Sequence, residues 1–158
     1  MKLFWPVLSG VLCTAHISFA EPRVTYNAYG MPGLVDMPSA QSALDAELSF
    51  SVSQSGESLR NTLTFQIAPR LTGAFRYAST ERPQGTLYDR SFDLRYRLLD
   101  ETHLRPAVAV GLQDFIGTGV YSGEYVAASK SFGPVVATAG IGWGRLGSHN
   151  SFDNPLGV

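Results

Sequence analysis

Residues 88–113 read YDRSFDLRYRLLDETHLRPAVAVGLQ and contain two runs of alternating polarity on either side of a short polar turn. This alternation indicates β-strands, because successive side chains of a strand point to opposite faces of a sheet. One face of both runs carries large apolar residues, and the other carries charged and small ones. Each run is about 10 residues long, enough for a tilted strand to cross a bilayer, whereas strands of soluble proteins usually have about 5–6 residues. The pattern therefore predicts the wall of a membrane β-barrel with lipid outside and a polar lumen.

Similar runs recur along the chain, so we expect an all-β fold, an antiparallel transmembrane β-barrel of outer-membrane type. The expected strands span residues 45–53, 60–68, 70–78, 88–99, 103–113, 119–131 and 134–144. Their connections are expected to alternate, long at 53–60, 79–87 and 114–118 and short at 69, 100–102 and 132–133. Bacterial barrels have an even number of strands, and an open sheet edge is not viable in lipid. Residues 47–158 are therefore predicted to hold only the seven N-terminal strands of an incomplete barrel.

Residues 1–20 predict a secretory signal peptide. Lys2 precedes an apolar segment at 3–13, and a small-x-small cleavage site ends at Ala20. Cys13 suggests a lipoprotein as the alternative, but Leu12 stands before it where a small residue is usual. Cleavage after Ala20 leaves no cysteine. Because Lys2 is one of 12 basic residues, cleavage also leaves 11 basic against 13 acidic residues, a net charge of −2. This balance implies no nucleic-acid partner.

Residues 21–46 differ from the predicted strands, because proline and glycine recur every few positions, as in YGMPGLVDMPSA at 29–40. Such a segment forms neither a regular helix nor a central strand. Two interpretations remain open. The segment is either an extended lead-in that packs through its Met, Leu and Val side chains, or a plug that lies against one mouth of the barrel.

Residues 29–40 resemble the opening motif of the YjbH family, bacterial outer-membrane proteins linked to exopolysaccharide production. The matching residues are Gly30, Pro32, Gly33, Leu34, Val35, Asp36, Pro38, Ser39 and Ala40. Residues 106–119, 121–130 and 142–147 are also similar to that family. Family members are several times longer, so the chain resembles an N-terminal fragment. The resemblance implies a non-enzymatic barrel in the cell outer membrane that assists export or assembly of an exopolysaccharide. Its expected partners are outer-membrane lipid, polysaccharide and other envelope proteins of the pathway.

Side-chain parity assigns the two faces of the predicted wall. The lipid-facing residues are Leu48, Phe50, Val52, Leu63, Phe65, Ile67, Leu71, Phe75, Tyr77, Val135, Ala137, Ala139, Ile141 and Trp143. The lumen-facing residues are Glu47, Gln66, Arg76, Asp93, Arg95, Arg97, Arg105 and Glu124. The parity of residues 119–131 is mixed, since Val120 and Val126 share the parity of Glu124. Interior charges usually pair, so the lumen-facing set either braces the wall or contacts polysaccharide.

Other chemistry has little support in the sequence. Gly140, Gly142 and Gly144 imitate the spacing of a nucleotide-binding loop, but they lie inside a predicted strand rather than before a helix. With no thiol and no pair of histidines at ligand spacing, we expect no metal or other cofactor. No Gly-x-Ser-x-Gly motif occurs, so no catalytic residue is assigned. An outer-membrane hydrolase of lipase or protease type, with its catalytic half outside this sequence, is the alternative function.

Overall fold

The computed structural model describes residues 24–147, so the signal peptide predicted at residues 1–20 lies outside the described range. Within that range, seven strands form one antiparallel sheet in sequence order. They are β3 (Leu48–Ser55), β4 (Ser58–Ala68), β5 (Leu71–Thr80), β6 (Leu87–Leu99), β7 (Ala107–Ile116), β8 (Gly123–Phe132) and β9 (Val135–Gly144). A single 3₁₀ turn, η1 (Arg145–Gly147), follows β9. The prediction of an all-β chain of antiparallel strands is confirmed.

The strand boundaries follow the predicted runs, and the differences have local causes. β7 begins at Ala107 rather than at residue 103, because Pro106 has no backbone N–H to donate to the sheet. The prediction of alternating loop lengths is wrong at two connections. Residues 56–57 form a tight turn, which Gly56 permits with a φ of 57°, and residues 100–106 form a long connection. None of the helices in the described part of the chain is long and apolar enough to span a membrane.

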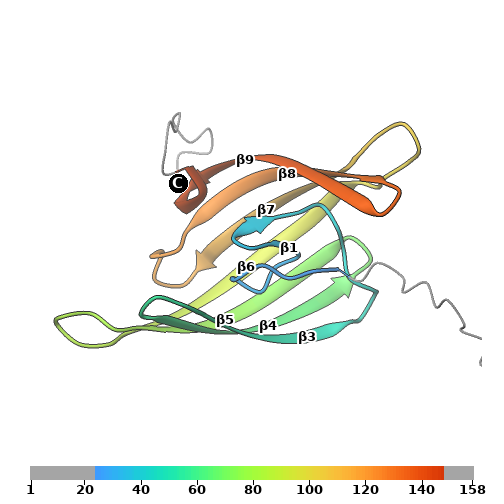
Figure 1. The fold of residues 1–158 in the computed structure, drawn as a ribbon. Helices are drawn as coiled ribbons and strands as arrows, with labels where there is room; N and C mark the ends of the chain where they lie inside the picture. Colours follow the sequence, from blue (N-terminus) through green and yellow to red (C-terminus); the bar gives the residue numbers. More distant parts are fainter. Residues whose placement is uncertain (1–23, 148–158) are drawn as a thin grey trace, which may run out of the picture.

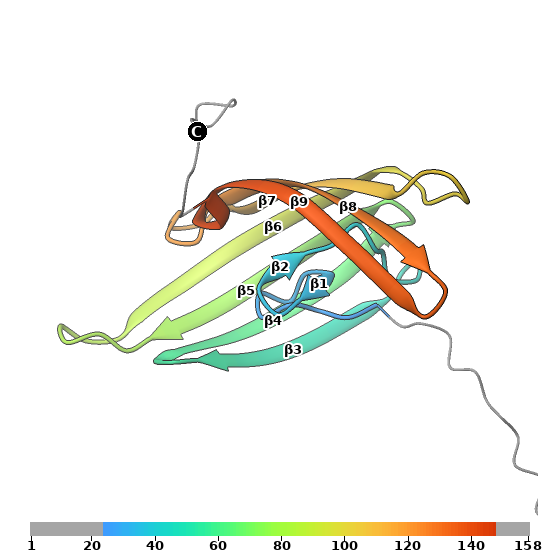
Figure 2. The same ribbon diagram turned by 45° about the horizontal axis from the view of Figure 1, so that its top comes forward.

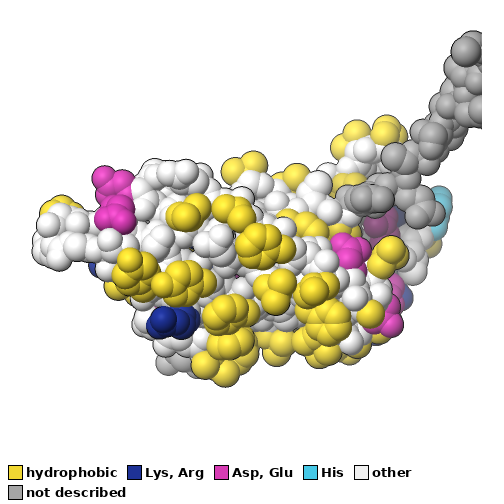
Figure 3. Space-filling model, turned by 90° about the horizontal axis from the view of Figure 1, so that it is seen from below, with side chains coloured by type: hydrophobic (Ala, Val, Ile, Leu, Met, Phe, Trp, Pro, Cys, Tyr) yellow, Lys and Arg dark blue, Asp and Glu magenta, His cyan; other side chains and the backbone are white. Residues whose placement is uncertain are grey.

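The two faces of the sheet have opposite polarity. Large apolar side chains are exposed on the convex face, including the cross-strand row Phe50, Leu63, Phe75 and Phe92 (Figure 3). These four side chains are between 37% and 66% exposed. The concave face instead buries polar and charged side chains of the same strands. Among them are Arg60, Thr62, Thr64, Gln66, Thr72, Arg76, Ser91, Asp93 and Arg95. Soluble domains bury their apolar face, so the polarity of this sheet is inverted.

The sheet is curled but not closed (Figure 1). β3 and β9 are its two edges, and they do not pair with each other. Both views show the strands curving around a common interior, with β9 on one side and β3 on the other (Figure 2). The described residues therefore form a half-barrel, and the closed transmembrane barrel expected from the sequence is not complete within them.

Residues 24–46 lie against the concave face (Figure 2). A miniature hairpin pairs β1 (Gly33–Leu34) with β2 (Met37–Pro38), and an isolated bridge joins Tyr26 to Pro32. Gly30 allows the close approach of this segment to the sheet. Its φ is 77°, and a Cβ there would lie 2.5 Å from the Cβ of Thr62 on β4. Proline and glycine thus shape a compact segment inside the curl, while its division from the barrel at residue 46 stays a prediction.

Candidate functional site in the concave face

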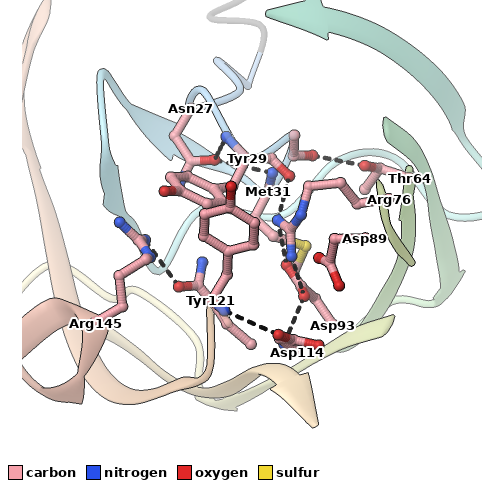
Figure 4. A network of polar contacts seen from close by, with 12 residues as sticks. Asn27, Tyr29, Met31, Thr64, Arg76, Asp89, Asp93, Asp114, Tyr121 and Arg145 are labelled. Atoms are coloured by element: carbon pink, nitrogen blue, oxygen red, sulfur yellow. Dashed lines mark hydrogen bonds and ion pairs between the residues drawn. The ribbon is translucent and has the colours of Figure 1, made fainter. Parts of the chain in front are cut away.

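A buried ion pair lies near the middle of the concave face (Figure 4). Arg76 on β5 donates from both terminal nitrogens to the carboxylate of Asp93 on β6, at 2.6 and 3.0 Å. The two side chains are 0% and 1% exposed. Arg76 is directly opposite Ser91, so Asp93 is its diagonal neighbour, a position that long side chains reach across antiparallel strands. Removing either partner would leave an uncompensated buried charge, which is costly.

The same region of the sheet holds residues 24–46 through their backbone. Arg76 also donates to the carbonyl of Tyr29 at 3.1 Å, and Thr64 on β4 donates to the carbonyl of Gly30 at 2.6 Å. Farther along, the backbone N–H of Ala40 donates to Ser129 Oγ on β8 at 2.9 Å. Strands from both halves of the sheet therefore fix the segment.

The ring of Tyr29 is the centre of a cluster of cations. The guanidinium carbons of Arg60, Arg76 and Arg145 lie 4.6, 4.9 and 3.7 Å from its centroid. The ring of Tyr121 meets it edge-on, with centroids 5.8 Å apart. Cation–π contacts are stronger where water is excluded, and Tyr29 is buried. Tyr29 therefore anchors residues 24–46 in the concave face.

A bulge in β7 brings a second carboxylate to the ion pair. The register between β6 and β7 shifts between Phe92 and Leu94, opposite the bulge. Asp114 has a φ of 50°, a left-handed conformation that aspartate visits more readily than most residues. Its backbone N–H donates to Asp93 Oδ1 at 2.9 Å, and its Oδ2 accepts from the backbone N–H of Tyr121 at 2.9 Å. Bulges re-aim side chains and are frequent beside functional sites.

Arg95 on β6 is a buried cation without a carboxylate partner among the described residues. It donates to Thr72 Oγ1 at 3.2 Å, to the carbonyl of Gln41, and to Ser42 Oγ at 3.4 Å. Thr72 in turn donates to Gln66 Oε1 at 2.8 Å. Since neutral oxygens alone hold this guanidinium, it retains its attraction for an anion.

Two further residues of the predicted lumen-facing set lie at the concave side near one end of the sheet. Glu47 accepts from the hydroxyl of Tyr26 at 3.1 Å, and Arg97 pairs with Asp100 at 3.0 Å. Burial raises the pKa of Tyr26. The structure thus brings Gln66, Arg76, Asp93 and Arg95 together on the concave face, with Glu47 and Arg97 beside them.

Arg105 and Glu124 do not join that group, so their predicted orientation is wrong. Arg105 is exposed in the connection before β7, because the strand begins only after Pro106. Glu124 pairs laterally with Leu112 and Trp143, and it shares the convex face with them. Residues 117–122 form a loop, so the parity of the predicted strand from residue 119 does not carry into β8.

Several residues of the network are absent from the predicted set. They are Tyr29, Arg60, Gln113, Asp114, Tyr121 and Arg145. Arg60 shares the parity of Gln66 on the same strand, so the alternation of β4 is enough to predict that Arg60 faces the interior. Asp114 and Gln113 follow an apolar run, but nothing in that run indicates a bulge. Arg145 comes after the last strand and reaches Tyr29 only through the curl of the sheet.

The connections at 69–70 and 100–106 form a rim at the same end of the sheet as Glu47 and Arg97. Arg70 and Arg97 both pair with Asp100, and Lys130 pairs with Glu101 at 3.2 Å. The backbone N–H of Ser131 donates to Glu101 at 2.8 Å and holds the pKa of that carboxyl below its usual range. These pairs are exposed to solvent, so each contributes little to stability.

The fold and the site define an all-β protein whose curled antiparallel sheet is apolar outside and polar inside, with a proline- and glycine-rich segment held in its interior. A family model described as "Exopolysaccharide biosynthesis protein YbjH" matches residues 25–158. The chain belongs to this YjbH family of exopolysaccharide biosynthesis proteins.

A relative from Escherichia coli (strain K12), named "Uncharacterized lipoprotein YjbH", is similar to most of this chain. It is 37% identical over 138 residues, which cover 81% of this chain and 20% of the relative. The chain therefore spans about a fifth of the length of that relative. No solved structure matches the chain.

Proposed function

We propose that this chain forms part of the wall of an outer-membrane β-barrel that assists export or assembly of an exopolysaccharide without catalysing a reaction. The inverted polarity of the sheet carries this proposal. Outer-membrane barrels place an apolar surface toward lipid and polar residues inside, and this sheet has large apolar side chains outside and buried charges within. Membership of the exopolysaccharide biosynthesis family supports the pathway.

The open edges of the half-barrel support a larger wall in the full-length protein. Unpaired strand groups cost several kcal/mol each in hydrocarbon, so β3 and β9 need partners in a membrane. The β1–β2 hairpin also supports a larger wall, because its apolar side chains Leu34, Val35 and Met37 are 54%, 85% and 57% exposed. A further wall around the interior would cover them. The E. coli relative, of which this chain covers 20%, has the length for such a wall.

The proposal predicts that the full-length protein is recovered in the outer-membrane fraction and begins at Glu21 after processing. Recovery as a soluble periplasmic monomer would contradict the barrel. The name of the E. coli relative supports a different anchor, a lipid on Cys13. Labelling with radioactive palmitate, compared between the natural sequence and Cys13→Ala, distinguishes the two. We expect no label in either form, whereas label lost in Cys13→Ala would show lipid modification.

Arg95 is our candidate for contact with an anionic polymer. An Arg95→Gln variant is expected to lower the amount of exported polymer several-fold while leaving the amount of folded protein unchanged. The reason is that a guanidinium donates two parallel hydrogen bonds to a carboxylate of the polymer, which an amide cannot do. Access requires that Gln41 and Ser42 move aside, since both accept from Arg95. Arg97→Gln is the matched control, because Asp100 already pairs with Arg97. If export and folded protein fall in proportion in Arg95→Gln, Arg95 only braces the wall.

A further inference from the structure

The end of the β1–β2 hairpin is an apolar surface in the interior of the curl. Leu34, Val35 and Met37, here named the hairpin tip, are exposed, while residues 31–33 and 38–40 on either side are buried. Both views place the hairpin inside the curl (Figure 1 and Figure 2), so lipid around the convex face does not reach the tip. Exposed apolar patches mark interaction sites.

Val35 is the most exposed residue of the hairpin tip, and its backbone is unfavourable as well. Its φ is 51°, in the left-handed region, where a β-branched side chain is rarely found. Val35 begins the two-residue loop between the paired residues Leu34 and Met37, a position that usually has glycine when its φ is positive. Glycine or asparagine would suit both this conformation and water. Burial of the valine side chain against an apolar surface would remove the cost of its exposure and offset the strain.

The hairpin is fixed by contacts that leave its apolar side chains uncovered. The carbonyl of Val35 accepts from the backbone N–H of Ala28 at 2.6 Å. The carboxylate of Asp36, the other residue of the loop, pairs with Arg145 at 3.0 Å. The hairpin tip is therefore held in one conformation before it meets a partner, which lowers the entropic cost of binding.

Residues 24–46 carry apolar side chains both against the sheet and away from it. Tyr29 and Ala40 are buried where Arg76 and Ser129 contact their backbone. The hairpin tip has no such cover from the described wall. A segment that is fixed to one surface and leaves further apolar side chains uncovered is expected to lie between two surfaces.

The chemistry of the hairpin tip indicates what covers it. Its three side chains offer no hydrogen-bonding nitrogen or oxygen, so a polysaccharide would leave hydroxyl groups unpaired there. An apolar protein surface fits the tip, because burial of apolar area is favourable on both sides. Such a surface is available in the same molecule. The edges β3 and β9 need further strands in a membrane, and the chain spans about a fifth of the length of the E. coli relative.

We propose that the hairpin tip docks into an apolar socket on the inner face of the strands that complete the barrel. Residues 24–46 then bridge the interior from one wall to the other and form a plug within the lumen. The described wall holds this plug through hydrogen bonds and the ring of Tyr29, and the remaining wall holds it through apolar contact. This assignment rests on the proposed function, since it needs the closed barrel.

Cross-linking of the full-length protein in outer membranes identifies the occupant. Leu34 is replaced with the photoreactive residue p-benzoylphenylalanine, and mass spectrometry locates the cross-link after irradiation. We expect a link within one chain to a residue that follows residue 147. A link to a second copy, to polysaccharide or to β3–β9 would overturn the assignment, as would the absence of any link.

Labelling of a cysteine measures whether the tip is covered. Val35→Cys and Thr138→Cys are each introduced into full-length protein without other cysteines, and a water-soluble maleimide is added in detergent micelles. Thr138 is exposed on the concave side of β9, so it reports access to the interior. We expect Val35→Cys to react at least about tenfold more slowly, because a covered thiol reacts only when its contact opens. Equal rates at the two positions, whether fast or slow, would overturn the docking.

Val35→Asn tests the contact through the sign of its effect. Asparagine relieves the left-handed strain and is well solvated, so an undocked tip would keep or raise the melting temperature of the full-length protein. A docked tip loses apolar contact and buries an unpaired amide, so we expect the melting temperature to fall by several degrees. Heat-modifiable gel mobility measures it.

The assignment needs all three results, and failure of any one overturns it. Its failure is distinct from failure of the proposed function. A natural protein that reaches the outer membrane and supports export, but has a freely labelled tip, overturns the docking and leaves the proposed function intact. Recovery of that protein as a soluble periplasmic monomer overturns the barrel itself.

Discussion

Replacing Arg76 with alanine in the full-length protein is expected to lower the free energy of unfolding by about 3–5 kcal/mol, the usual cost of breaking a buried ion pair. Asp93 would keep a buried charge with the backbone N–H of Asp114 as its remaining donor. The carbonyl of Tyr29 would lose its contact as well. Urea unfolding of the purified protein in detergent, followed by tryptophan fluorescence, measures the difference.

A double variant separates the ion pair from the packing around it. Arg76→Met combined with Asp93→Leu removes both charges and keeps similar volumes, so it should destabilise the protein less than either single change. The double-mutant cycle then gives the coupling free energy of the pair. A loss below about 1 kcal/mol in Arg76→Ala, the range of exposed ion pairs, would show that water reaches this part of the interior.

Leu63→Arg is expected to disfavour membrane insertion of the full-length protein by about 2–4 kcal/mol, the cost of a cation on the lipid side near mid-bilayer. Leu63 lies in the middle of β4, is 44% exposed, and has Phe50 and Phe75 as its lateral neighbours. The measurement is the urea dependence of folding into lipid vesicles, with heat-modifiable gel mobility as the readout.

The matched control for Leu63→Arg is Thr138→Arg on β9. Thr138 is exposed and lies opposite Ser129 on the concave side, so an arginine there enters the polar interior. The expected loss is about 1 kcal/mol, from the hydroxyl contact with Ser129. Equal damage at positions 63 and 138 would contradict a membrane-facing convex surface.

The strands and most of their faces follow from the sequence because the period of a strand is local. In β6, Phe92, Leu94 and Tyr96 alternate with Asp93 and Arg95, and the structure separates the two sets onto opposite faces. The same alternation assigns the concave face of β4 correctly, because the residues that share the parity of Gln66 are the buried ones. Each of these assignments needs only the residues of one strand.

The pairing of side chains between strands inside the curl cannot be predicted from the sequence of any single strand. The register of β5 against β6 places Arg76 beside Asp93, and these two residues form the ion pair. Arg95 is closer to Asp93 in sequence, but it donates to neutral oxygens instead. Glu124 changes face because the loop before β8 resets the parity. Both outcomes depend on turns and bulges, which alternation of polarity does not encode.

The attachment of residues 24–46 has a consequence for the order of folding. Ala40 and Ser129 are 89 positions apart, and Asp36 and Arg145, which pair at 3.0 Å, are 109 apart. Contacts of such high sequence separation form slowly, because loop-closure entropy is lost before they contribute. The hairpins of neighbouring strands close over far shorter loops. We therefore expect the contacts of Asp36 and Ala40 to form late, after β8 and β9 have joined the sheet, although they belong to the segment that comes first in the chain.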